Sequence, residues 1–286
     1  MLKRLLKFLL FLLTIAMIIA GFLAYGMFVS VERVNLNYQS AASSKIPKSL
    51  NNVQIAFISD IDYNAYMDKT RLSKMMKRLN DAHPDVIIFG GDLFYAPEKQ
   101  MPDETKQQEV TEILKKLDAP LGKFAVLGEQ DLMNADIKNM VSNILYNSDF
   151  EMITNQLVRI RKGGNASISL IGLDSMIGGQ PDISKAFQNV NANEFNMVFT
   201  HCPDLIAQLP TNNINVMVAG HSHGGQIALP LLGPLHKMSG AEAYNKGTYK
   251  VQQTTLSVSN GLGTRDTDVR LFAPPEIIIY RLAAAK

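Results

Sequence analysis

The order of the predicted elements indicates an α/β fold built as a sandwich, in which two packed sheets carry helices on their outer faces. Short apolar runs typical of buried strands alternate with amphipathic helical patterns from about residue 50 onward. Strand-like segments then dominate as far as the C-terminus. A separate apolar stretch near the N-terminus is long enough to cross a membrane, so it lies outside this domain.

The N-terminal segment has the pattern of an uncleaved membrane anchor. "MLKRLLK" is basic, and residues 8–31 come next without a charged side chain. At 1.5 Å per residue this run spans a hydrocarbon core of roughly 30 Å. A cleaved signal peptide is the alternative, but its apolar region is normally shorter and ends in a small-x-small site. We therefore expect a cytoplasmic tail at 1–7, a transmembrane helix at 8–31 and an extracytoplasmic domain, in keeping with the positive-inside rule.

The composition of the chain after the anchor excludes some classes of protein. Residues 32–49 are polar, small and Pro-containing, which predicts a flexible linker, and the folded domain is expected over residues 50–286. The formal net charge of +2 gives no basic excess, so no nucleic-acid partner is expected. Cys202 is the sole cysteine, which excludes an intrachain disulfide and a multi-cysteine metal site.

Three strand–helix pairs are predicted in the first half of the domain. Val53–Ser59, residues 86–91 and residues 124–128 are apolar runs that predict buried strands. Each precedes a stretch whose apolar residues recur at helical spacing. These stripes are Leu72, Met75, Met76 and Leu79; then Val110, Ile113, Leu114 and Leu117; then Ile137, Met140, Val141, Ile144 and Leu145.

The second half is predicted to be mostly β. The segments "QLVRIR", "ASISLIG", "NMVFTH", "NVMVAG", "TLSVSNG" and "PEIIIYRL" are apolar or alternating and contain many β-branched residues. They supply enough strands for a second sheet that packs on the first.

Carboxylates and imidazoles gather just after the predicted strands. Polar residues beyond the carboxyl ends of strands meet at one edge of such a sheet. Any one of them has an ordinary explanation as a turn or capping residue, but the ordered set is harder to dismiss. The set is Asp60, Asp62, Asp92, Glu129, Gln130, Asp131, His201, His221 and His223.

The blocks "ISDID", "GGDLF", "GEQD", "THCPD" and "GHSHGGQ" resemble, in order and spacing, the five motifs of the calcineurin-like metallophosphoesterases. The usual forms are D-x-H, G-D, G-N-H-D, H and G-H-x-H. The resemblance extends from about Val53 to the C-terminus and points to the membrane-anchored bacterial branch, some of whose members cleave lipid-linked or UDP-sugar phosphate esters. It implies a four-layer α/β/β/α sandwich of two mixed sheets.

The resemblance also implies two divalent ions. Asp92 would bridge them, Asp60 and His223 would hold one, and His201 and His221 the other. Such ions clamp a phosphate and activate a water for in-line attack. Mn²⁺, Mg²⁺, Fe²⁺, Zn²⁺ and Ca²⁺ are all compatible with the expected ligands, and carboxylates favour the harder ions.

Three positions depart from the family pattern. Asp62 replaces a histidine ligand, Glu129 replaces an asparagine ligand, and Gln130 replaces the histidine that contacts the phosphate and assists the leaving group. Asp131, the next residue, matches. Gln130 and Asp131 thus occupy the catalytic positions, and Asp62 and Glu129 are added to the expected metal ligands.

These departures change the expected chemistry. Two extra carboxylates would bring a two-ion site close to neutral, which weakens its attraction for an anion. Gln130 cannot donate a proton, and such acid catalysis is typically worth ~10²–10⁴-fold, so a good leaving group is expected. Glu129 is an alternative acid if crowding by Asp62 and Asp131 keeps it protonated.

Two functions remain open. The chain is either a membrane-anchored, metal-dependent phosphoesterase, which the retained ligands favour, or an impaired pseudoenzyme that serves as a binding or scaffolding module. The phosphoesterase would act on a phosphate ester or anhydride, such as a lipid-linked or nucleotide-sugar substrate. The apolar stretch "IALPLLGPL" could face lipid and admit such a substrate, or it could pack against the core.

Overall fold

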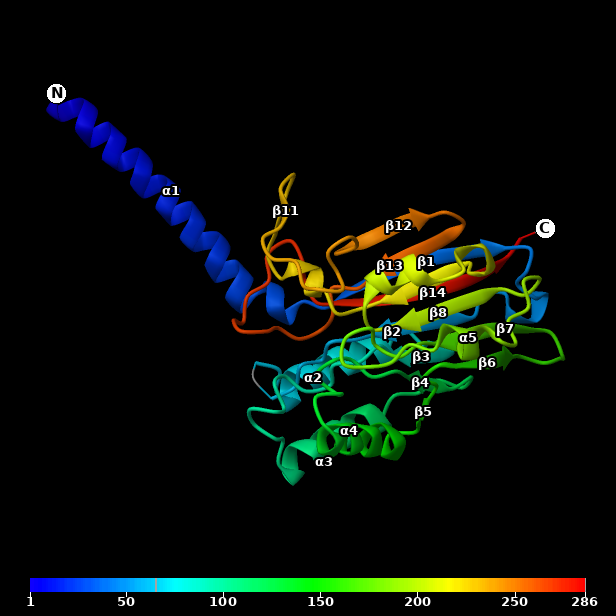
Figure 1. The fold of residues 1–286 in the computed structure, drawn as a ribbon. Coiled ribbons are helices and arrows are strands. Elements are labelled where there is room, and N and C mark those ends of the chain that lie inside the picture. Colours follow the sequence, from blue (N-terminus) through cyan, green and yellow to red (C-terminus); the bar gives the residue numbers. More distant parts are fainter. Residues whose placement is uncertain (65, 286) are drawn as a thin grey trace.

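Two six-stranded sheets pack face to face in the computed structural model, which describes residues 1–64 and 66–285 (Figure 1). A long helix, α1, projects from the same molecule. Helices cover the outer face of the first sheet, and shorter helical segments cover the outer face of the second. The predicted α/β/β/α sandwich of two mixed sheets is confirmed.

The first sheet has the strand order β1-β14-β2-β3-β4-β5. Strands β2 to β5 are mutually parallel, and β14 is antiparallel to β2. The bounds are β1 Asn35–Ser43, β2 Gln54–Ile58, β3 Val86–Phe89, β4 Lys123–Ala125, β5 Phe150–Met152 and β14 Glu276–Ala284.

The second sheet has the order β12-β13-β9-β8-β7-β6. Its four inner strands are parallel, and both edge strands run antiparallel to them. The carboxyl ends of β8, β9 and β13 therefore meet at one edge. The bounds are β6 Gln156–Arg161, β7 Ser167–Gly172, β8 Asn196–Thr200, β9 Val216–Ala219, β12 Gly247–Val251 and β13 Thr254–Val258.

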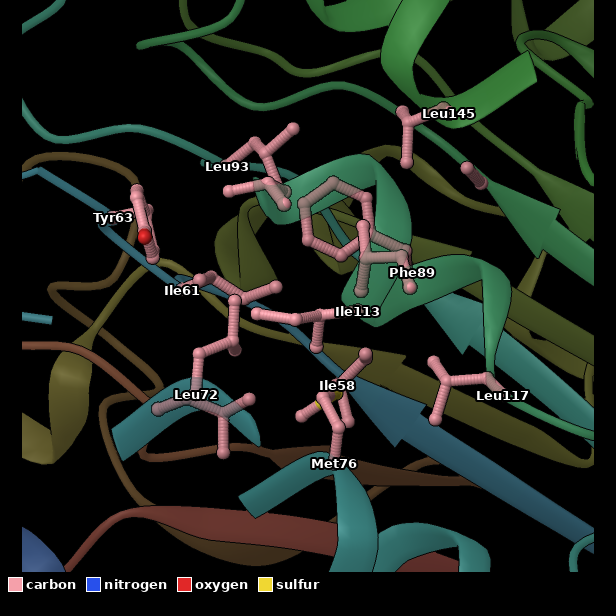
Figure 2. Close-up of a cluster of buried hydrophobic side chains, with 14 of the residues drawn as sticks. Ile58, Ile61, Tyr63, Leu72, Met76, Phe89, Leu93, Ile113, Leu117 and Leu145 are labelled. Atoms are coloured by element: carbon pink, nitrogen blue, oxygen red, sulfur yellow. The ribbon is translucent and has the colours of Figure 1, made fainter. Parts of the chain in front are cut away.

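The predicted helices form where the apolar stripes lie. They are α2 Lys69–Asn80, α3 Glu104–Lys115 and α4 Ala135–Asn147. Each begins after a side chain that accepts the backbone N–H three residues later, namely Asp68, Asp103 and Asn134. Their stripes face the first sheet and build the core shown in Figure 2, which includes Leu72, Phe89 and Leu145.

Two further cores complete the layers. Phe57, Val126 and Phe199 lie in the core between the two sheets. A third core, with Ile171, Met217 and Leu256, lies against the outer face of the second sheet under α5 Ile183–Phe187. The remaining short elements are η1 Ser30–Glu32, η2 Lys48–Leu50, η3 Pro203–Gln208, η4 Thr211–Asn213, η5 His223–Gly225, β10 Ala228–Leu229 and β11 Gly233–Pro234.

The predicted flexible linker at 32–49 is wrong in this structure, because most of it forms β1. The strand pairs in parallel with β14 along its whole length, from Asn35 with Glu276 to Ser43 with Ala284. Its side chains are mostly polar because it is an edge strand with one row of neighbours. Composition alone therefore suggested a tether, while backbone pairing with a strand from the far end of the chain decides the outcome.

Helix α1 (Leu2–Phe28) is long and apolar enough to cross a membrane. Its C-terminal end is fastened to the domain. The backbone N–H of Arg270 donates to the carbonyl of Gly26 (3.2 Å), and Arg71 in α2 donates to the carbonyl of Val31 (2.7 Å). Arg71 also pairs with Asp268 at 3.0 Å, which links the helix exit to the loop after β13.

Candidate metal centre

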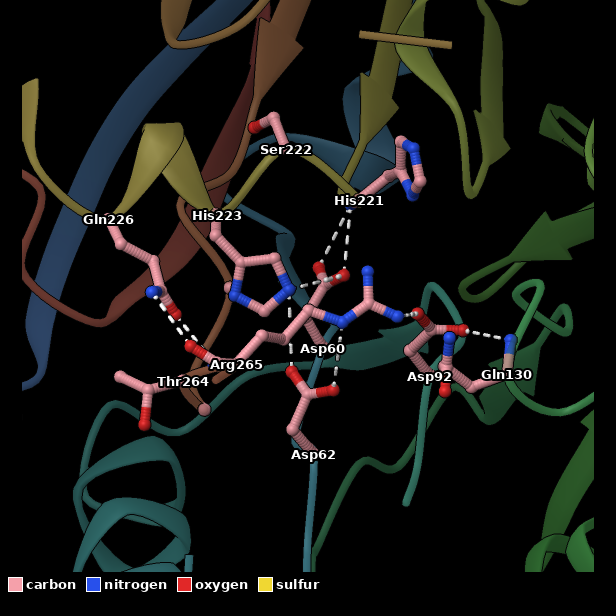
Figure 3. Close-up of polar contacts among 12 residues, drawn as sticks. Asp60, Asp62, Asp92, Gln130, His221, Ser222, His223, Gln226, Thr264 and Arg265 are labelled. Atoms are coloured by element: carbon pink, nitrogen blue, oxygen red, sulfur yellow. Dashed lines mark hydrogen bonds and ion pairs between the residues drawn. The ribbon is translucent and has the colours of Figure 1, made fainter. Parts of the chain in front are cut away.

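The loops after five strands bring the predicted metal ligands together. Asp60 and Asp62 follow β2, Asp92 follows β3, and Glu129 follows β4. From the second sheet, His201 follows β8, while His221 and His223 follow β9. Six of these seven side chains are almost fully buried, and the side chain of Glu129 is 12 % exposed. Several of them are seen in Figure 3.

The backbone at this edge is held in conformations that side chains seldom adopt. The φ angles of Asp60, Asp62, Asp92, His221 and His223 lie between 48° and 69°. Left-handed backbone costs a non-glycine residue roughly 1–3 kcal/mol and persists only where the surrounding structure enforces it. Such strain concentrates at functional sites, which marks this edge of the sheets as the candidate site.

Glycines let the chains approach closely here. A Cβ on Gly128 would collide with Oδ1 of Asp92, and one on Gly220 would collide with Oδ2 of Asp60. Both spaces are already filled by site carboxylates. The "GEQD" turn thus starts with glycine because Asp92 packs directly against it.

Asp131 lies beneath Asp92 and holds the loops in place. Its carboxylate accepts hydrogen bonds from the backbone N–H groups of Asp92 (2.8 Å), Leu93 (2.9 Å) and Gly128 (3.0 Å). Burial raises the pKa of Asp131 to about 7, as does the charge of Asp92. These contacts favour a positioning role instead of the catalytic role that the sequence suggested, because both oxygens already serve the backbone.

Gln130 also bonds to the backbone. Its N–H donates to Oδ1 of Asp92 (2.9 Å), and its side-chain Oε1 accepts from the N–H of Ala96 (3.1 Å). The amide thereby joins the "GEQD" turn to the loop after β3. The backbone N–H of Gln130 fixes the orientation of the Asp92 carboxylate, which leaves Oδ2 facing the centre.

Two histidines converge on Glu129. Oε2 of Glu129 lies 2.7 Å from Nε2 of His201 and 3.0 Å from Nδ1 of His221. The other nitrogen of each ring contacts a backbone carbonyl, that of Gly90 or Ser239, each at 2.7 Å. Those carbonyls can only accept, so the outer nitrogens donate to them, and each inner nitrogen faces Glu129, where it carries a proton or, with an ion bound, would offer a lone pair.

Charge at this cluster favours a cation. Burial would lower the pKa of His201, but Asp92 and Glu129 raise it well above its usual range. Burial would raise the pKa of Glu129, but His201 and His221 hold it far below its usual range. These contacts favour the ionised form of Glu129, which argues against the alternative in which it acts as a protonated acid. A positive charge, either a proton or a metal ion, is favoured between these three side chains.

A second group of carboxylates and imidazole lies beside the first. Nε2 of His223 is 3.4 Å from Oδ2 of Asp62 and 3.6 Å from Oδ1 of Asp60. Both oxygens of Asp60 accept the backbone N–H of His221. The side-chain oxygens of Asp62 and both ring nitrogens of His223 are buried without a hydrogen-bond partner among the described residues. Burial raises the pKa of Asp62 well above its usual range, and Arg265 only partly offsets this effect.

Arg265 enters the centre between the two groups (Figure 3). Nη1 and Nη2 each lie 3.1 Å from Oε1 of Glu129, and Nη2 lies 3.2 Å from Oδ2 of Asp92. Its Nε is 3.7 Å from Oδ1 of Asp62. Burial would lower the pKa of Arg265, but these three carboxylates raise it above its usual range, so the charge is permanent.

Comparison with known protein families matches the part of the chain that carries the predicted metal ligands. The family model of the calcineurin-like phosphoesterases matches residues 53–225, which is more than half of the chain. This chain belongs to the calcineurin-like phosphoesterase family. The matched region begins at β2 and ends at η5, so it contains every predicted metal ligand.

Relatives of this phosphoesterase are found in bacteria and animals. YkuE of Bacillus subtilis, an uncharacterised metallophosphoesterase, is 26% identical over 267 residues, which covers 93% of this chain and 92% of YkuE. LpxG of Chlamydia muridarum, a UDP-2,3-diacylglucosamine pyrophosphatase, is 27% identical and covers 83% of this chain and 86% of its own. A transmembrane protein with a metallophosphoesterase domain from Danio rerio is 24% identical, over 92% of this chain and 61% of its own.

The two groups of the phosphoesterase differ in how well they fit an ion. The ligand atoms of Asp92, Glu129, His201 and His221 all lie within 4.8 Å of one another, as atoms around one ion must. Both histidines there have the carbonyl partners that orient metal-binding imidazoles. This group fits a divalent ion. The group of Asp60, Asp62 and His223 shares its space with a guanidinium, and the described residues give His223 no such partner.

A cavity of about 400 Å³ opens beside the centre. Its lining includes Gln130, His223 and Arg265, which contact the carboxylate cluster, and also Lys99 and His236. The cavity therefore borders residues that contact the carboxylate cluster, and it is large enough for a phosphate with part of an attached group.

Sequence reasoning missed Arg265 and the place of His236. Arg265 follows β13, whose carboxyl end lies at the same edge as that of β9 because the two strands pair in parallel. The rule that found the other site residues, applied to "TLSVSNG", would have reached it. The sequence around His236 indicates only a polar loop, and the folded chain shows that this loop borders the cavity.

Proposed function

We propose that this phosphoesterase hydrolyses a phosphate ester or anhydride next to a membrane, with at least one divalent ion in its centre. One observation carries the proposal: Asp92, Glu129, His201 and His221 converge as a buried ligand set beside an open cavity. When bound, a divalent ion supplies electrostatic stabilisation of the phosphoryl group and a more acidic water.

The chain's own residues would bind and orient the substrate. Arg265 lies between the carboxylates and the cavity, where its guanidinium can hold phosphate oxygens. Lys99 lines the same cavity and adds a second positive charge. Gln130 keeps Asp92 in one orientation through its backbone N–H.

A good leaving group is favoured because the position of the family's histidine acid is taken by an amide. Gln130 Oε1 already accepts the N–H of Ala96, and a neutral amide cannot transfer a proton to a leaving group as an acid. A phosphoanhydride loses least from that change. The relationship to LpxG, a UDP-2,3-diacylglucosamine pyrophosphatase, supports an anhydride that carries acyl chains.

The membrane arrangement is part of the proposal. Residues 1–7 would be cytoplasmic, and the domain would lie on the extracytoplasmic side, since Lys3, Arg4 and Lys7 precede the apolar run. The span would be the part of the predicted residues 8–31 that lies in α1, up to Phe28, because Ser30 and Val31 are buried against the domain. The apolar length of α1 supports this arrangement. In this arrangement the cavity would lie close to the bilayer, where it could bind a phosphate that carries a lipid.

The test is hydrolysis by the full chain in phosphatidylcholine nanodiscs supplied with manganese. Three probes are compared: a UDP-sugar, p-nitrophenyl phosphate and glycerol 3-phosphate. We expect the anhydride and the activated ester to be cleaved faster than the alkyl ester. Asp92→Asn should abolish turnover, while Asp118→Asn at an exposed position should not. Faster cleavage of glycerol 3-phosphate would contradict the leaving-group argument.

A binding module without catalysis is the second candidate. It is favoured by the closed network around Glu129, whose two oxygens already face Arg265 and both histidines. With both oxygens facing cationic or protonated side chains, Glu129 does not require an ion. Metal content separates the two functions, since a preparation that binds no divalent ion and cleaves no probe would be the binding module.

A further inference from the structure

We propose that the guanidinium of Arg265 takes the place of one of the two divalent ions implied by the family pattern. The chain would then bind a single ion, held by Asp92, Glu129, His201 and His221. This inference rests on the proposed metal-dependent function.

The position of the guanidinium supports the replacement. Oδ2 of Asp92 is the oxygen left free to face the centre, because Oδ1 accepts the N–H of Gln130. Nη2 of Arg265 lies 3.2 Å from that Oδ2, on the side toward Asp62. The guanidinium fills the space between that oxygen and Asp62, where a second ion would lie, whereas the other side of Oδ2 faces Nε2 of His201 at 3.4 Å and belongs to the first ligand group.

Arg265 is built into the site and is not a surface side chain that folds inward by chance. Its side chain is only 12 % exposed. Its backbone is clamped by Gln226, whose Oε1 accepts the N–H of Arg265 (2.5 Å) and whose Nε2 donates to its carbonyl (3.0 Å). Gln226 directly follows the "GHSHGG" segment, so one histidine-bearing loop positions the arginine.

The two groups of ligands are also asymmetric in their support. His201 and His221 have carbonyl partners that fix which nitrogen faces the centre. The outer nitrogen of His223 has none among the described residues. Asp60 and Asp62 remain beside it, however, so the donors for an ion are still present once the guanidinium is removed.

The test counts ions. The full chain in detergent is equilibrated with manganese, freed of unbound metal, and analysed by mass spectrometry of the metal and by isothermal titration. Wild type is expected to bind one ion per chain. Arg265→Met, which keeps the length and removes the charge, is expected to bind two. Arg281→Met at an exposed position on β14 is the control and should bind one.

Each outcome decides between the proposals. Two ions in wild type would overturn the replacement and leave the proposed function intact. No ion in either protein would overturn the proposed function itself. One ion in both wild type and Arg265→Met would also overturn the replacement, provided that circular dichroism shows both proteins folded.

A separate observation concerns the hairpin of β10 and β11. Its turn and flank carry Leu231, Leu232 and Leu235, which are 106 %, 80 % and 64 % exposed. Figure 1 shows this hairpin extending from the domain on the same side as α1. Exposed leucines clustered on a protruding turn mark an interaction surface.

The hairpin is connected to the membrane helix through the loop at Leu271. The N–H of Ala228 donates to the carbonyl of Leu271 (2.9 Å), and the side chain of Leu271 packs on Gly26. The rings of Phe272 and Phe22 have centroids 6.2 Å apart. Phe22 lies about six residues, or roughly 9 Å, before the end of α1, so the domain reaches back along the apolar helix.

We infer that the hairpin of residues 228–235 dips into the bilayer that α1 crosses. Lys237 and Lys246 lie with it around one surface depression, at the level where phosphate headgroups would meet them. His236 directly follows Leu235 and lines the cavity of the centre. A lipid-bearing phosphate would thus reach the centre without leaving the membrane surface.

The absence of tryptophan from the sequence makes the test direct. Leu232→Trp places a single fluorescent reporter at the turn, and Tyr146→Trp places one at an exposed position on α4. Each full chain is reconstituted in vesicles of phosphatidylcholine and phosphatidylglycerol with and without doxyl-labelled lipid. We expect the emission of the Leu232→Trp variant to shift to shorter wavelength and to be quenched, and the emission of the Tyr146→Trp variant to do neither.

Both variants carry the same anchor, so attachment by α1 cannot account for a difference between them. Leu235→Trp is a second reporter in case the turn variant folds poorly. Emission from both hairpin variants that matches the Tyr146→Trp variant in wavelength and quenching would overturn the inference.

Discussion

Nη1 and Nη2 of Arg265 both lie 3.1 Å from Oε1 of Glu129, although the two residues are 136 positions apart in the chain. The other oxygen of Glu129 faces His201 and His221. Glu129 therefore joins the guanidinium to the imidazole pair. The family pattern has an asparagine here, which is neutral and shorter and therefore could not form this ion pair. The carboxylate of Glu129 and the guanidinium of Arg265 thus function as a pair.

Glu129→Gln should weaken ion binding by more than roughly 10–100-fold. That is the typical loss of metal affinity when a group that only hydrogen-bonds to a ligand is removed. The amide keeps the size of the side chain but removes the charge that faces the two histidines. Titration calorimetry with manganese measures the change. Glu151→Gln, at an exposed position on β5, is the matched control, and equal affinities in the two variants would show that Glu129 is not a ligand.

Gly128→Ala should disrupt the centre while leaving most of the fold intact. The added Cβ would collide with Oδ1 of Asp92, so that carboxylate must move away from the other ligands. Manganese binding should fall to the level of Asp92→Asn. Gly163→Ala, whose Cβ meets open space, bears only the cost of its positive φ and should bind as wild type does. Normal binding by Gly128→Ala would show that Asp92 is not needed in its observed position.

Strand β1 should contribute to the stability of the domain. A fragment from Ser49 lacks β1 and exposes the backbone edge of β14, whereas a fragment from Arg33 keeps the pairing. We expect the shorter fragment to unfold at a lower temperature and to aggregate more readily, because an unpaired edge strand recruits other chains. Differential scanning calorimetry and light scattering measure both effects. Equal melting temperatures would mean that residues 33–48 are a dispensable tether after all.

Removal of divalent ions should destabilise the folded domain. A ligand that binds only the folded state at 100 times its Kd adds about 2.7 kcal/mol to the free energy of unfolding. The unfolding temperature of wild type should therefore be higher with manganese than with EDTA. His201→Ala removes one inward nitrogen and should abolish most of the difference. His83→Ala, away from the centre, should preserve it; a manganese effect that survives in His201→Ala would place the ion elsewhere.

Much of the fold could be predicted from local patterns. Helical stripes such as Leu72 to Leu79 and apolar runs such as residues 86–89 fix their own secondary structure, since burial of those side chains requires a helix or a strand. Strand ends also indicated where Asp60, Asp92 and His201 would meet, because parallel strands share one edge.

What the sequence determined by itself is therefore the layered α/β architecture, the apolar helix and the set of residues at one sheet edge. Only the tertiary structure decided that residues 35–43 form a strand, because an edge strand is held by hydrogen bonds to β14 and not by its own composition. Only the tertiary structure also brought Arg265 among the carboxylates. Its position depends on the clamp by Gln226 and on charges from Asp62, Asp92 and Glu129, which lie on three separate loops. Interactions between segments so distant in sequence leave no local pattern from which they could be predicted.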